Sequence, residues 1–310
     1  MCELYVPATS ANLGPGFDSL GLALKLYNKF SFERIDQGLE IEVLERDGTV
    51  IDIPVDDNLI YKAVNRFTRD SGIKVEGLRI TEISSIPLAR GLGSSATAIV
   101  GTLSGLNQIY DRPLTQKRLL DIAVSIEGHS DNVVPACVGG FVINVLKGNK
   151  LNYRKIPINN PGVSIVLIIP DFELKTSDLR AVLPGVVDFQ DALFNQSRTA
   201  LLASIFCDQD WELLSVAMED RLHQDYRAKL IPGFKAVVDR GYTAGADGVA
   251  LSGAGPTVIA FTRYHPRQVA REMVKTFARH DVTSNYIITG IDNMGVNRNS
   301  GLFQGGEEVD

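Results

Sequence analysis

The chain has 310 residues, of which 45% are hydrophobic and 22% charged, and its formal net charge is −6. This length exceeds the usual limit for one hydrophobic core, so we expect two domains with a cleft between them. The negative charge argues against a nucleic-acid or membrane surface, and no apolar run approaches the ~20 residues of a membrane helix. Cys2, Cys137 and Cys207 have no disulfide or zinc spacing. We expect a cytoplasmic protein with small-molecule partners, and neither nucleic acid nor membrane among them.

The first half of the chain is predicted to alternate strands with helices. Alternating apolar residues between positions 3 and 55 predict strands, and Asp47-Gly48 predicts a hairpin turn. The elements expected next are a helix from Asp57 to Gly72, a strand Leu78–Ser84, a helix after Thr97, a helix from Thr115 to Glu127 and a strand Phe141–Val145. The Asn-, Pro- and Gly-rich segment Lys147–Gly162 is the predicted linker. It places the domains at 1–155 and 156–296, with a mobile tail at 297–310.

The second half opens with an apolar, β-branched run, Val163–Ile169, which predicts a buried strand. The elements expected after it are helices at 176–183, 188–206, 210–222 and 234–240, strands at 248–251 and 257–261, a helix around 269–277 and a strand near 285–288. Strand, helices, two strands, helix and strand is the order of a split βαβ or ferredoxin-like domain.

The stretch Pro87–Thr97 is a Gly/Ser turn without acidic residues that runs into an apolar helix. Gly91 and Gly93 permit backbone conformations in which successive N–H groups point inward, and the helix start adds further donors. The stretch therefore predicts a cradle for phosphate. The alternative is an ordinary glycine-rich turn capped by Ser94 or Ser95.

Two known phosphate loops do not fit this stretch. No Lys follows Gly93, which excludes a Walker A loop. Gly91 to Ala96 does match the dinucleotide pattern G-x-G-x-x-[GA]. In a dinucleotide-binding fold an acidic residue at the end of the next parallel strand contacts the ribose, and Asp111 has a suitable spacing for that role. However, the helix after the loop is followed by a turn and a second helix instead of a strand, and Asp111 lies in that turn, which excludes this fold.

Three further stretches complete a set of spaced motifs: Pro7–Asp18, Glu127–Pro135 and Leu251–Thr257. Together with Pro87–Thr97 they resemble the GHMP kinase family of small-molecule kinases. The resemblance reaches about Ile291 and implies an α+β, two-domain fold, with a ribosomal-protein-S5-domain-2-like N-terminal domain and a ferredoxin-like C-terminal domain. Within the family, three features resemble the members that phosphorylate L-homoserine: the loop Ala11–Asp18, the run His129–Asn132, and Tyr226-Arg227 ahead of Leu230–Gly233.

The resemblance implies ATP and Mg²⁺ as cofactors. The residues expected to hold the nucleotide are Asn58, Pro87, Leu88, Ala89, Arg90, Gly91, Leu92, Gly93, Ser94, Ser95, Ala96 and Thr97. Ser95 and Glu127 are the expected metal ligands, because a hydroxyl and a carboxylate suit a hard cation. The alternatives are that Glu127 is an exposed charge at a helix end and that Asn58, expected at the adenine, only caps a helix.

The residues that the resemblance places around the substrate are Asn12, Asp18, His129, Asp131, Asn132, Arg198, Arg227, Gly253 and Gly255. Asp18 suits an ammonium group, and the two arginines suit a carboxylate. The alternatives are an interdomain salt bridge for Arg227 and a structural role for His129. Asp131, Ser95 and Glu127 are the catalytic candidates. Whether Asp131 acts as a general base or the site relies on transition-state stabilisation stays open.

The implied activity is ATP-dependent phosphorylation of the side-chain hydroxyl of L-homoserine, a step of threonine biosynthesis. One alternative is another GHMP small-molecule kinase, of the mevalonate or sugar type. The other is a non-catalytic ligand sensor on the same fold. Dimers are common among relatives, so a homodimer is one arrangement that the resemblance allows.

Overall fold

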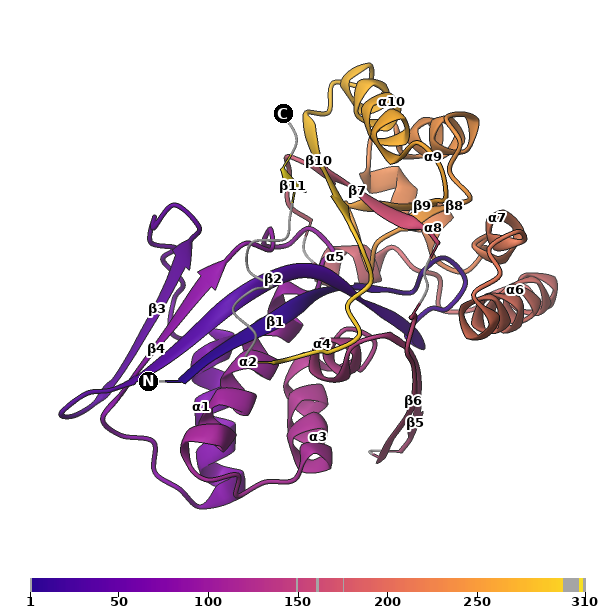
Figure 1. Ribbon diagram of the computed structural model, residues 1–310. Helices are drawn as coiled ribbons and strands as arrows, with labels where there is room; N and C mark the ends of the chain where they lie inside the picture. Colours follow the sequence, from indigo (N-terminus) through magenta and orange to yellow (C-terminus); the bar gives the residue numbers. More distant parts are fainter. Residues whose placement is uncertain (1, 149, 160–161, 175, 298–306, 309–310) are drawn as a thin grey trace.

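The computed structural model describes residues 2–148, 150–159, 162–174, 176–297 and 307–308. They form two lobes, each built on its own β-sheet (Figure 1). The elements of the first lobe are β1 Cys2–Ala11, β2 Leu20–Arg34, β3 Leu39–Glu45, α1 Leu59–Ser71, β4 Leu78–Ser84, α2 Ser94–Ile109, α3 Gln116–Glu127, α4 Val133–Val138, β5 Phe141–Lys147 and β6 Lys150–Ile156. Those of the second are β7 Ser164–Pro170, α5 Thr176–Ala181, α6 Phe189–Asp208, α7 Leu214–Ala217, α8 Gln224–Arg227, the 3₁₀ turn η1 Ala228–Leu230, α9 Phe234–Thr243, β8 Gly248–Leu251, β9 Val258–Thr262, α10 Pro266–Ala278, β10 Ser284–Thr289 and β11 Glu307–Glu308. No helix in the described part of the chain combines the length and the apolar character needed to cross a lipid bilayer.

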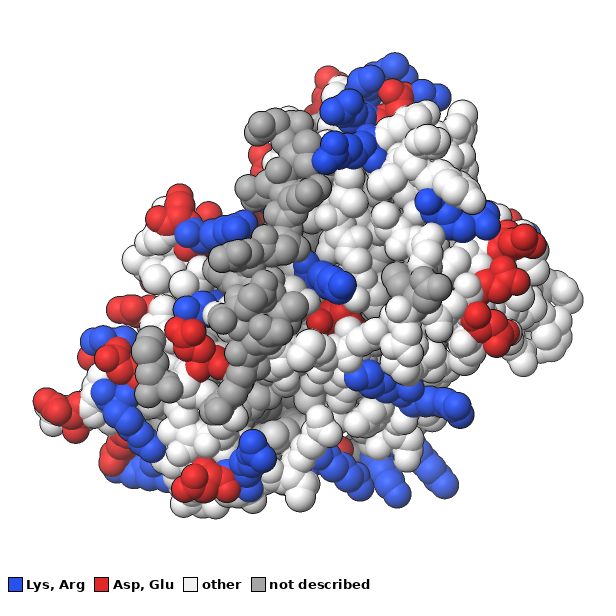
Figure 2. Space-filling view, in the orientation of Figure 1, with Lys and Arg blue, Asp and Glu red and all other residues white. Residues whose placement is uncertain are grey.

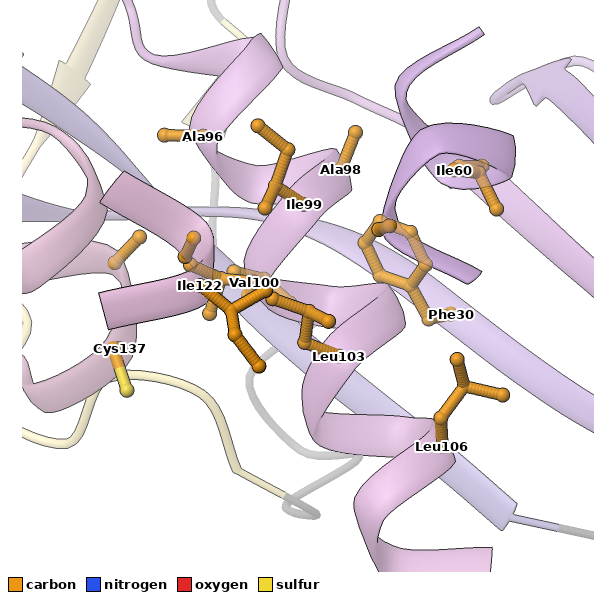
Figure 3. Packing of buried hydrophobic residues seen from close by; sticks show 14 of the residues in the cluster. Phe30, Ile60, Ala96, Ala98, Ile99, Val100, Leu103, Leu106, Ile122 and Cys137 are labelled. Carbon is orange, nitrogen blue, oxygen red and sulfur yellow. The ribbon is translucent and has the colours of Figure 1, made fainter. Parts of the chain in front are cut away.

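The sheet of the first lobe has the order β3-β4-β2-β5-β6, and β1 pairs antiparallel with the long strand β2. Helices α1 to α4 cover one face of this sheet (Figure 1). The apolar face predicted for the helix after the glycine loop is confirmed: in α2 Ile99, Val100, Leu103 and Leu106 are buried, and they share a core cluster with Phe30 of β2 (Figure 3). Burying this face fixes α2 on the sheet.

Two glycines set how closely α2 approaches β2. A Cβ atom at Gly101 would lie 2.6 Å from the ring of Phe30, and one at Gly105 would lie 2.0 Å from the ring of Phe32. These distances are far below a normal contact, so a larger residue would push the helix off the strand. Because α2 starts directly after the glycine loop, this packing also determines where the loop lies.

The second sheet has the order β11-β10-β7-β9-β8, and its strands pair antiparallel. In chain order the main strands β7, β8, β9 and β10 are separated by helices between β7 and β8 and by α10 between β9 and β10. This arrangement is the split βαβ or ferredoxin-like pattern expected from the sequence. The expectation of an α+β, two-domain architecture is confirmed.

A shared hydrophobic core joins the two lobes. The buried strand β7 directs Ile165 and Leu167 into a cluster that also contains Phe141 of the first sheet, whereas Val166 and Ile168 face α10 and its neighbours. Phe141 stacks on Phe206 of α6 with ring centroids 4.1 Å apart. The period of two along a strand therefore lets β7 serve both cores.

After β10 the chain returns to the first lobe. Ile291 forms an isolated bridge with Leu24, and Asn297 does so with Tyr5. Asn293 exchanges two hydrogen bonds with the backbone of Ile158, at 2.8 and 2.9 Å. The segment that leaves the second lobe thus lies beside the segment that enters it.

Two predictions about local structure were wrong. The predicted linker Lys147–Gly162 contains strand β6, which forms a hairpin with β5. The helix expected over 210–222 is limited to the single turn α7. The domain limits at 155 and 296 stay predictions, and the predicted mobile tail 297–310 lies outside the described residues except for 297 and 307–308.

Candidate active site

The site lies where the glycine loop, the N-terminal loop and the second lobe meet. A cavity of about 240 Å³ opens there. Its lining residues are Ala11, Asn12, Asp18, Ala89, Gly91, Gly93, Ser94, Ser95, Glu127, His129, Asp131, Asn132, Leu174, Arg180, Arg227, Gly253, Ala254 and Gly255. Residues from all four of the spaced sequence motifs therefore line one cavity.

The glycine loop packs closely against neighbouring backbone and side chains, and its backbone angles favour glycine. Gly91 and Gly93 have φ values of 78° and 72°, a region that favours glycine. A Cβ atom at Gly91 would lie 2.3 Å from the carbonyl oxygen of Ser252, and one at Gly93 would lie 2.0 Å from Thr9 Oγ1. Neither position has room for a side chain.

Helix α2 begins at this loop with Gly93 as its N-cap, and no side chain caps its first N–H groups. The reading as a turn capped by Ser94 or Ser95 is therefore wrong. The first turn contains no acidic residue. A helix start with uncapped N–H groups and no negative charge attracts anions such as phosphate.

Ser95, in the first turn of α2, lies beside Glu127, at the end of α3. The Ser95 hydroxyl donates a hydrogen bond to Glu127 Oε1, and Glu127 is the last residue of α3. Only 9% of the Glu127 side chain is exposed, so it is not the exposed helix-end charge of the alternative reading. Burial raises the pKa of its carboxyl above the usual value, against the opposing hydrogen bond from Ser95.

His129 and Asp131 form a pair on the cavity wall, with His129 Nδ1 2.9 Å from Asp131 Oδ1. Because a carboxylate accepts hydrogen bonds, Nδ1 carries the proton. Burial acts to lower the pKa of His129, but Asp131 and then Glu127 outweigh it, and the pKa is raised. The pair therefore favours a charged imidazole near the glycine loop.

The N-terminal loop supplies an amide and a carboxylate. Asn12 Nδ2 donates to the carbonyl of Gly253 at 2.8 Å, and Asn12 Oδ1 accepts from the backbone N–H of Asp18 at 2.9 Å. Asn132, which also lines the cavity, accepts a hydrogen bond from Thr9 Oγ1 at 2.8 Å. Asn12 thus links the turn Gly253–Gly255 of the second lobe to the loop that carries Asp18.

Two arginines line the cavity, and only one of them was expected. Arg227 is almost fully buried, with 2% of its surface exposed. Arg180 of α5 pairs with Asp18 Oδ1 at 2.7 Å, although no sequence motif pointed to it. Arg198 stands on α6 and does not line the cavity. Its guanidinium lies 3.0 Å from Glu219 Oε2 and over the ring of Phe194. The structure therefore places Arg180 where the sequence suggested Arg198.

Among the other nucleotide candidates, Pro87, Leu88 and Arg90 line a second cavity of about 490 Å³. Leu92, Ala96 and Thr97 are buried and line neither cavity, so their contact with the nucleotide stays a prediction. Asn58 lines neither cavity. Its side chain caps α1 by accepting from the N–H groups of Ile60 and Tyr61. This is the capping role of the alternative reading, and its contact with adenine stays a prediction.

Family models match both lobes of the chain. The model described as GHMP kinases N terminal domain matches residues 58–140, and the model described as GHMP kinases C terminal matches residues 199–279. The chain belongs to the GHMP kinase family. This membership agrees with the two-domain fold expected from the four motifs, and the mapped N-terminal region contains the glycine loop.

Relatives in the GHMP kinase family cover nearly the whole chain. The homoserine kinase of Halothermothrix orenii is 55% identical over 300 residues, which cover 96% of each chain. The homoserine kinase of Carboxydothermus hydrogenoformans is 45% identical over 289 residues, covering 93% of this chain and 94% of the relative. The crystal structure of homoserine kinase from Cytophaga hutchinsonii matches with a TM-score of 0.86 at 28% identity, covering 96% of each chain. Mevalonate kinase from Methanococcus jannaschii, with a TM-score of 0.69 at 17% identity over 93% of this chain and 98% of that one, shares the fold.

Proposed function

We propose that this chain transfers the γ-phosphoryl group of ATP to the side-chain hydroxyl of L-homoserine, giving O-phospho-L-homoserine on the route to threonine. The observation that carries the proposal is one cavity in which the glycine loop lies beside Asp18 and Arg227. An amino acid brings an ammonium for the carboxylate and a carboxylate for the guanidinium. The relatives at 55% and 45% identity, both homoserine kinases, support the same reaction.

The nucleotide is proposed to bind along the glycine loop. The N–H groups of Gly91, Gly93, Ser94 and Ser95 suit the triphosphate, and the cavity of about 490 Å³ beside Pro87 has room for the base. Ser95 and Glu127, already in contact, offer the hard oxygen donors that Mg²⁺ accepts beside water and phosphate. When bound, Mg²⁺ neutralises charge on the phosphates.

The chain's own task is to position the hydroxyl in line with the phosphoryl group, because this transfer needs little covalent chemistry from the protein. Asp131 lines the same cavity as Ser95, and its carboxylate accepts a hydrogen bond from His129 at 2.9 Å. We propose that Asp131 either takes the proton of the hydroxyl or orients it. His129, whose pKa is raised chiefly by Asp131, adds positive potential when protonated, at a place where negative charge accumulates.

A turnover screen tests the function. Purified protein is given ATP and Mg²⁺ with homoserine, mevalonate or galactose, and both ADP and the phosphorylated product are measured. We expect turnover with homoserine. Turnover with mevalonate or galactose but not with homoserine would assign another GHMP kinase activity, and no turnover with any of the three would indicate a ligand sensor.

We further propose a cytoplasmic enzyme that binds no nucleic acid, and a homodimer as the oligomeric state to test. The face in Figure 2 carries both signs of charge, with basic side chains gathered along its lower right edge and acidic ones along its right edge, and the net charge of the chain is −6. Analytical ultracentrifugation distinguishes the monomer from the dimer.

A further inference from the structure

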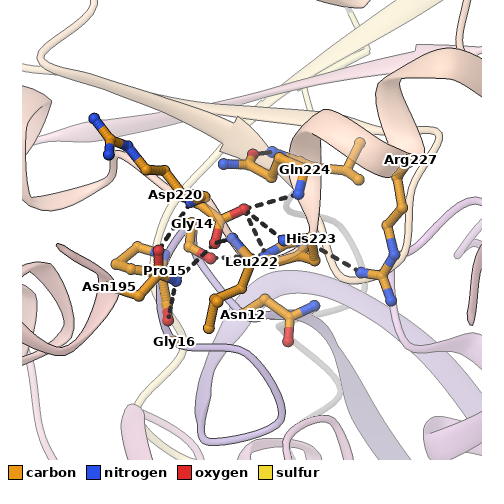
Figure 4. Close-up of polar contacts among 12 residues, drawn as sticks. Asn12, Gly14, Pro15, Gly16, Asn195, Asp220, Leu222, His223, Gln224 and Arg227 are labelled. Carbon is orange, nitrogen blue, oxygen red and sulfur yellow. Dashed lines mark hydrogen bonds and ion pairs between the residues drawn. The ribbon is translucent and has the colours of Figure 1, made fainter. Parts of the chain in front are cut away.

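Behind Arg227, away from the proposed nucleotide, lies a buried chain of polar side chains. The side chains of Asp220 and His223 are completely buried, and only 2% of Arg227 is exposed. Figure 4 shows how the three side chains follow one another. Buried charged groups are costly unless each is paired. None of the roles proposed above explains why Asp220 and His223 stand here.

The hydrogen bonds of His223 determine its tautomer. His223 Nε2 lies 2.8 Å from the carbonyl oxygen of Gly14, which can only accept, so Nε2 carries the proton. His223 Nδ1 lies 3.2 Å from Nη1 of Arg227, and a guanidinium can only donate. Nδ1 is therefore an unprotonated acceptor and the imidazole is neutral. Burial, the largest influence, also lowers the pKa of His223, although Asp220 opposes it.

Asp220 fixes the backbone that carries His223. Its carboxylate accepts from the N–H groups of Leu222, His223 and Gln224, at 2.7 to 3.0 Å, and from Asn195 Nδ2 at 2.8 Å (Figure 4). The helical turn that follows places residues 223 and 227 on one face, because their spacing is four. Asp220 thus sets the position from which the imidazole reaches the guanidinium.

The remaining contacts of Arg227 leave one terminal nitrogen of its guanidinium available. Nε donates to the carbonyl of Leu179 at 3.1 Å, and Nη1 donates to the carbonyl of Gly253 at 3.2 Å as well as to His223. Among the described residues, Nη2 has no protein acceptor within hydrogen-bond distance. Arg227 lines the cavity, so Nη2 is the donor left for a ligand.

We propose that His223 is a positioning residue which, as a neutral acceptor, fixes Arg227 so that Nη2 binds the carboxylate of the amino-acid substrate. Its other nitrogen donates to Gly14, in the loop that carries Asp18. His223 therefore couples the group for the substrate carboxylate to the loop for the substrate ammonium. This inference rests on the proposed function.

A matched pair of variants distinguishes the roles of the two ring nitrogens of His223. In His223→Asn the amide oxygen stands near the position of Nδ1 and keeps an acceptor for Arg227. In His223→Gln the amide nitrogen stands near Nε2 and keeps the donor to Gly14 but loses that acceptor. We expect His223→Gln to raise the KM for homoserine by about tenfold or more, with the KM for ATP within about twofold. His223→Asn is expected to raise the homoserine KM less.

A probe without the carboxylate checks that the effect passes through Arg227. The amino alcohol 3-aminopropan-1-ol is homoserine without its carboxylate, and its inhibition constant is expected to change less than about twofold in His223→Gln, since Arg227 has nothing to bind. The exposed His280→Gln is the control for a His-to-Gln change outside the cavity. Equal KM values for homoserine in the two His223 variants, or an equal loss for the probe, would overturn the inference.

Nitrogen NMR of the unaltered protein gives an answer that does not depend on the variants folding. We expect His223 to be neutral near pH 7 with the proton on Nε2. A proton on Nδ1, or a charged imidazole, would refute the inference even if homoserine is phosphorylated. A wild-type protein inactive on homoserine but with this tautomer would refute the proposed function instead.

Discussion

Asp131 faces the cavity with its carboxylate held by His129, and its replacement by Asn changes the charge at nearly constant shape. We expect Asp131→Asn to lower kcat by about 100-fold or more, because the neutral amide can neither accept the proton nor orient the hydroxyl through a negative charge. The pKa of His129 is expected to fall in the variant, since Asp131 now raises it. Steady-state kinetics and histidine NMR measure the two effects.

The exposed Asp239→Asn on α9 is the matched control and should leave kcat unchanged. A loss of only a few-fold in Asp131→Asn would eliminate the general base and leave transition-state stabilisation as the explanation.

Glu127 is expected to make the apparent affinity for Mg²⁺ depend on pH. A metal binds the carboxylate and not the carboxyl, and burial raises the pKa of Glu127. The affinity should therefore weaken as the pH falls through this raised pKa, at a higher pH than for an ordinary glutamate. We expect Glu127→Gln to raise the half-saturating Mg²⁺ concentration by about tenfold or more and to flatten this dependence. Mg²⁺ titrations of activity at several pH values between about 5 and 8 provide the measurement.

An unchanged Mg²⁺ requirement in Glu127→Gln would remove Glu127 from the metal site. The hydrogen bond with Ser95 would then be a structural contact.

At the scale of elements, the close approach of α2 to β2 depends on Gly105. We expect Gly105→Ala to lower the free energy of unfolding by about 1–3 kcal/mol, because its Cβ would lie 2.0 Å from Phe32. The loss should appear even though Ala favours a helix by up to about 1 kcal/mol. Urea unfolding measures it, with the half-buried Ser104→Ala of the same helix as control. A Gly105→Ala protein as stable as the wild type would show that α2 can move away from the sheet.

Elements with strong local signals were predictable from the sequence. The helix expected from Asp57 to Gly72 is α1, closed by Gly72 in the left-handed region, and strand Leu78–Ser84 is β4. Strand β6 was missed because most of its residues are exposed, so no apolar alternation marks it. Within 210–222 only Leu214–Ala217 is helical, and Asp220 accepts from the N–H groups of Leu222 and His223 ahead of the next helical turn, an alternative that the apolar pattern did not indicate.

The site residues also fall into two groups, those with a local sequence signal and those without one. The glycine loop and the residues of the motif loops were predictable because each short loop needs its glycines and polar side chains locally. Arg180 and Arg198 both stand in helices of the second lobe, and which one reaches the cavity depends on how α5 and α6 pack. That packing has no local sequence signal, so Arg198 was chosen and Arg180 was missed.

At the scale of the whole molecule, we expect the two lobes to unfold together. Trp211 is the chain's one tryptophan, and it contacts Phe206 in the core that contains residues of both sheets. Its fluorescence should therefore change in the same urea range as the far-UV circular dichroism of all the helices and strands. Two separated transitions would mean that the shared core does not couple the lobes.

The pair formed by Asn293 and Ile158 has a mechanical consequence. The second lobe leaves the first after β6 and rejoins it after β10, and these hydrogen bonds hold the two crossings side by side. In topological terms the second lobe is an insertion with adjacent ends. Because the two covalent connections lie together, they do not by themselves prevent one lobe from rotating against the other, and the shared core and the contact between Ser252 and Gly91 must supply that restraint.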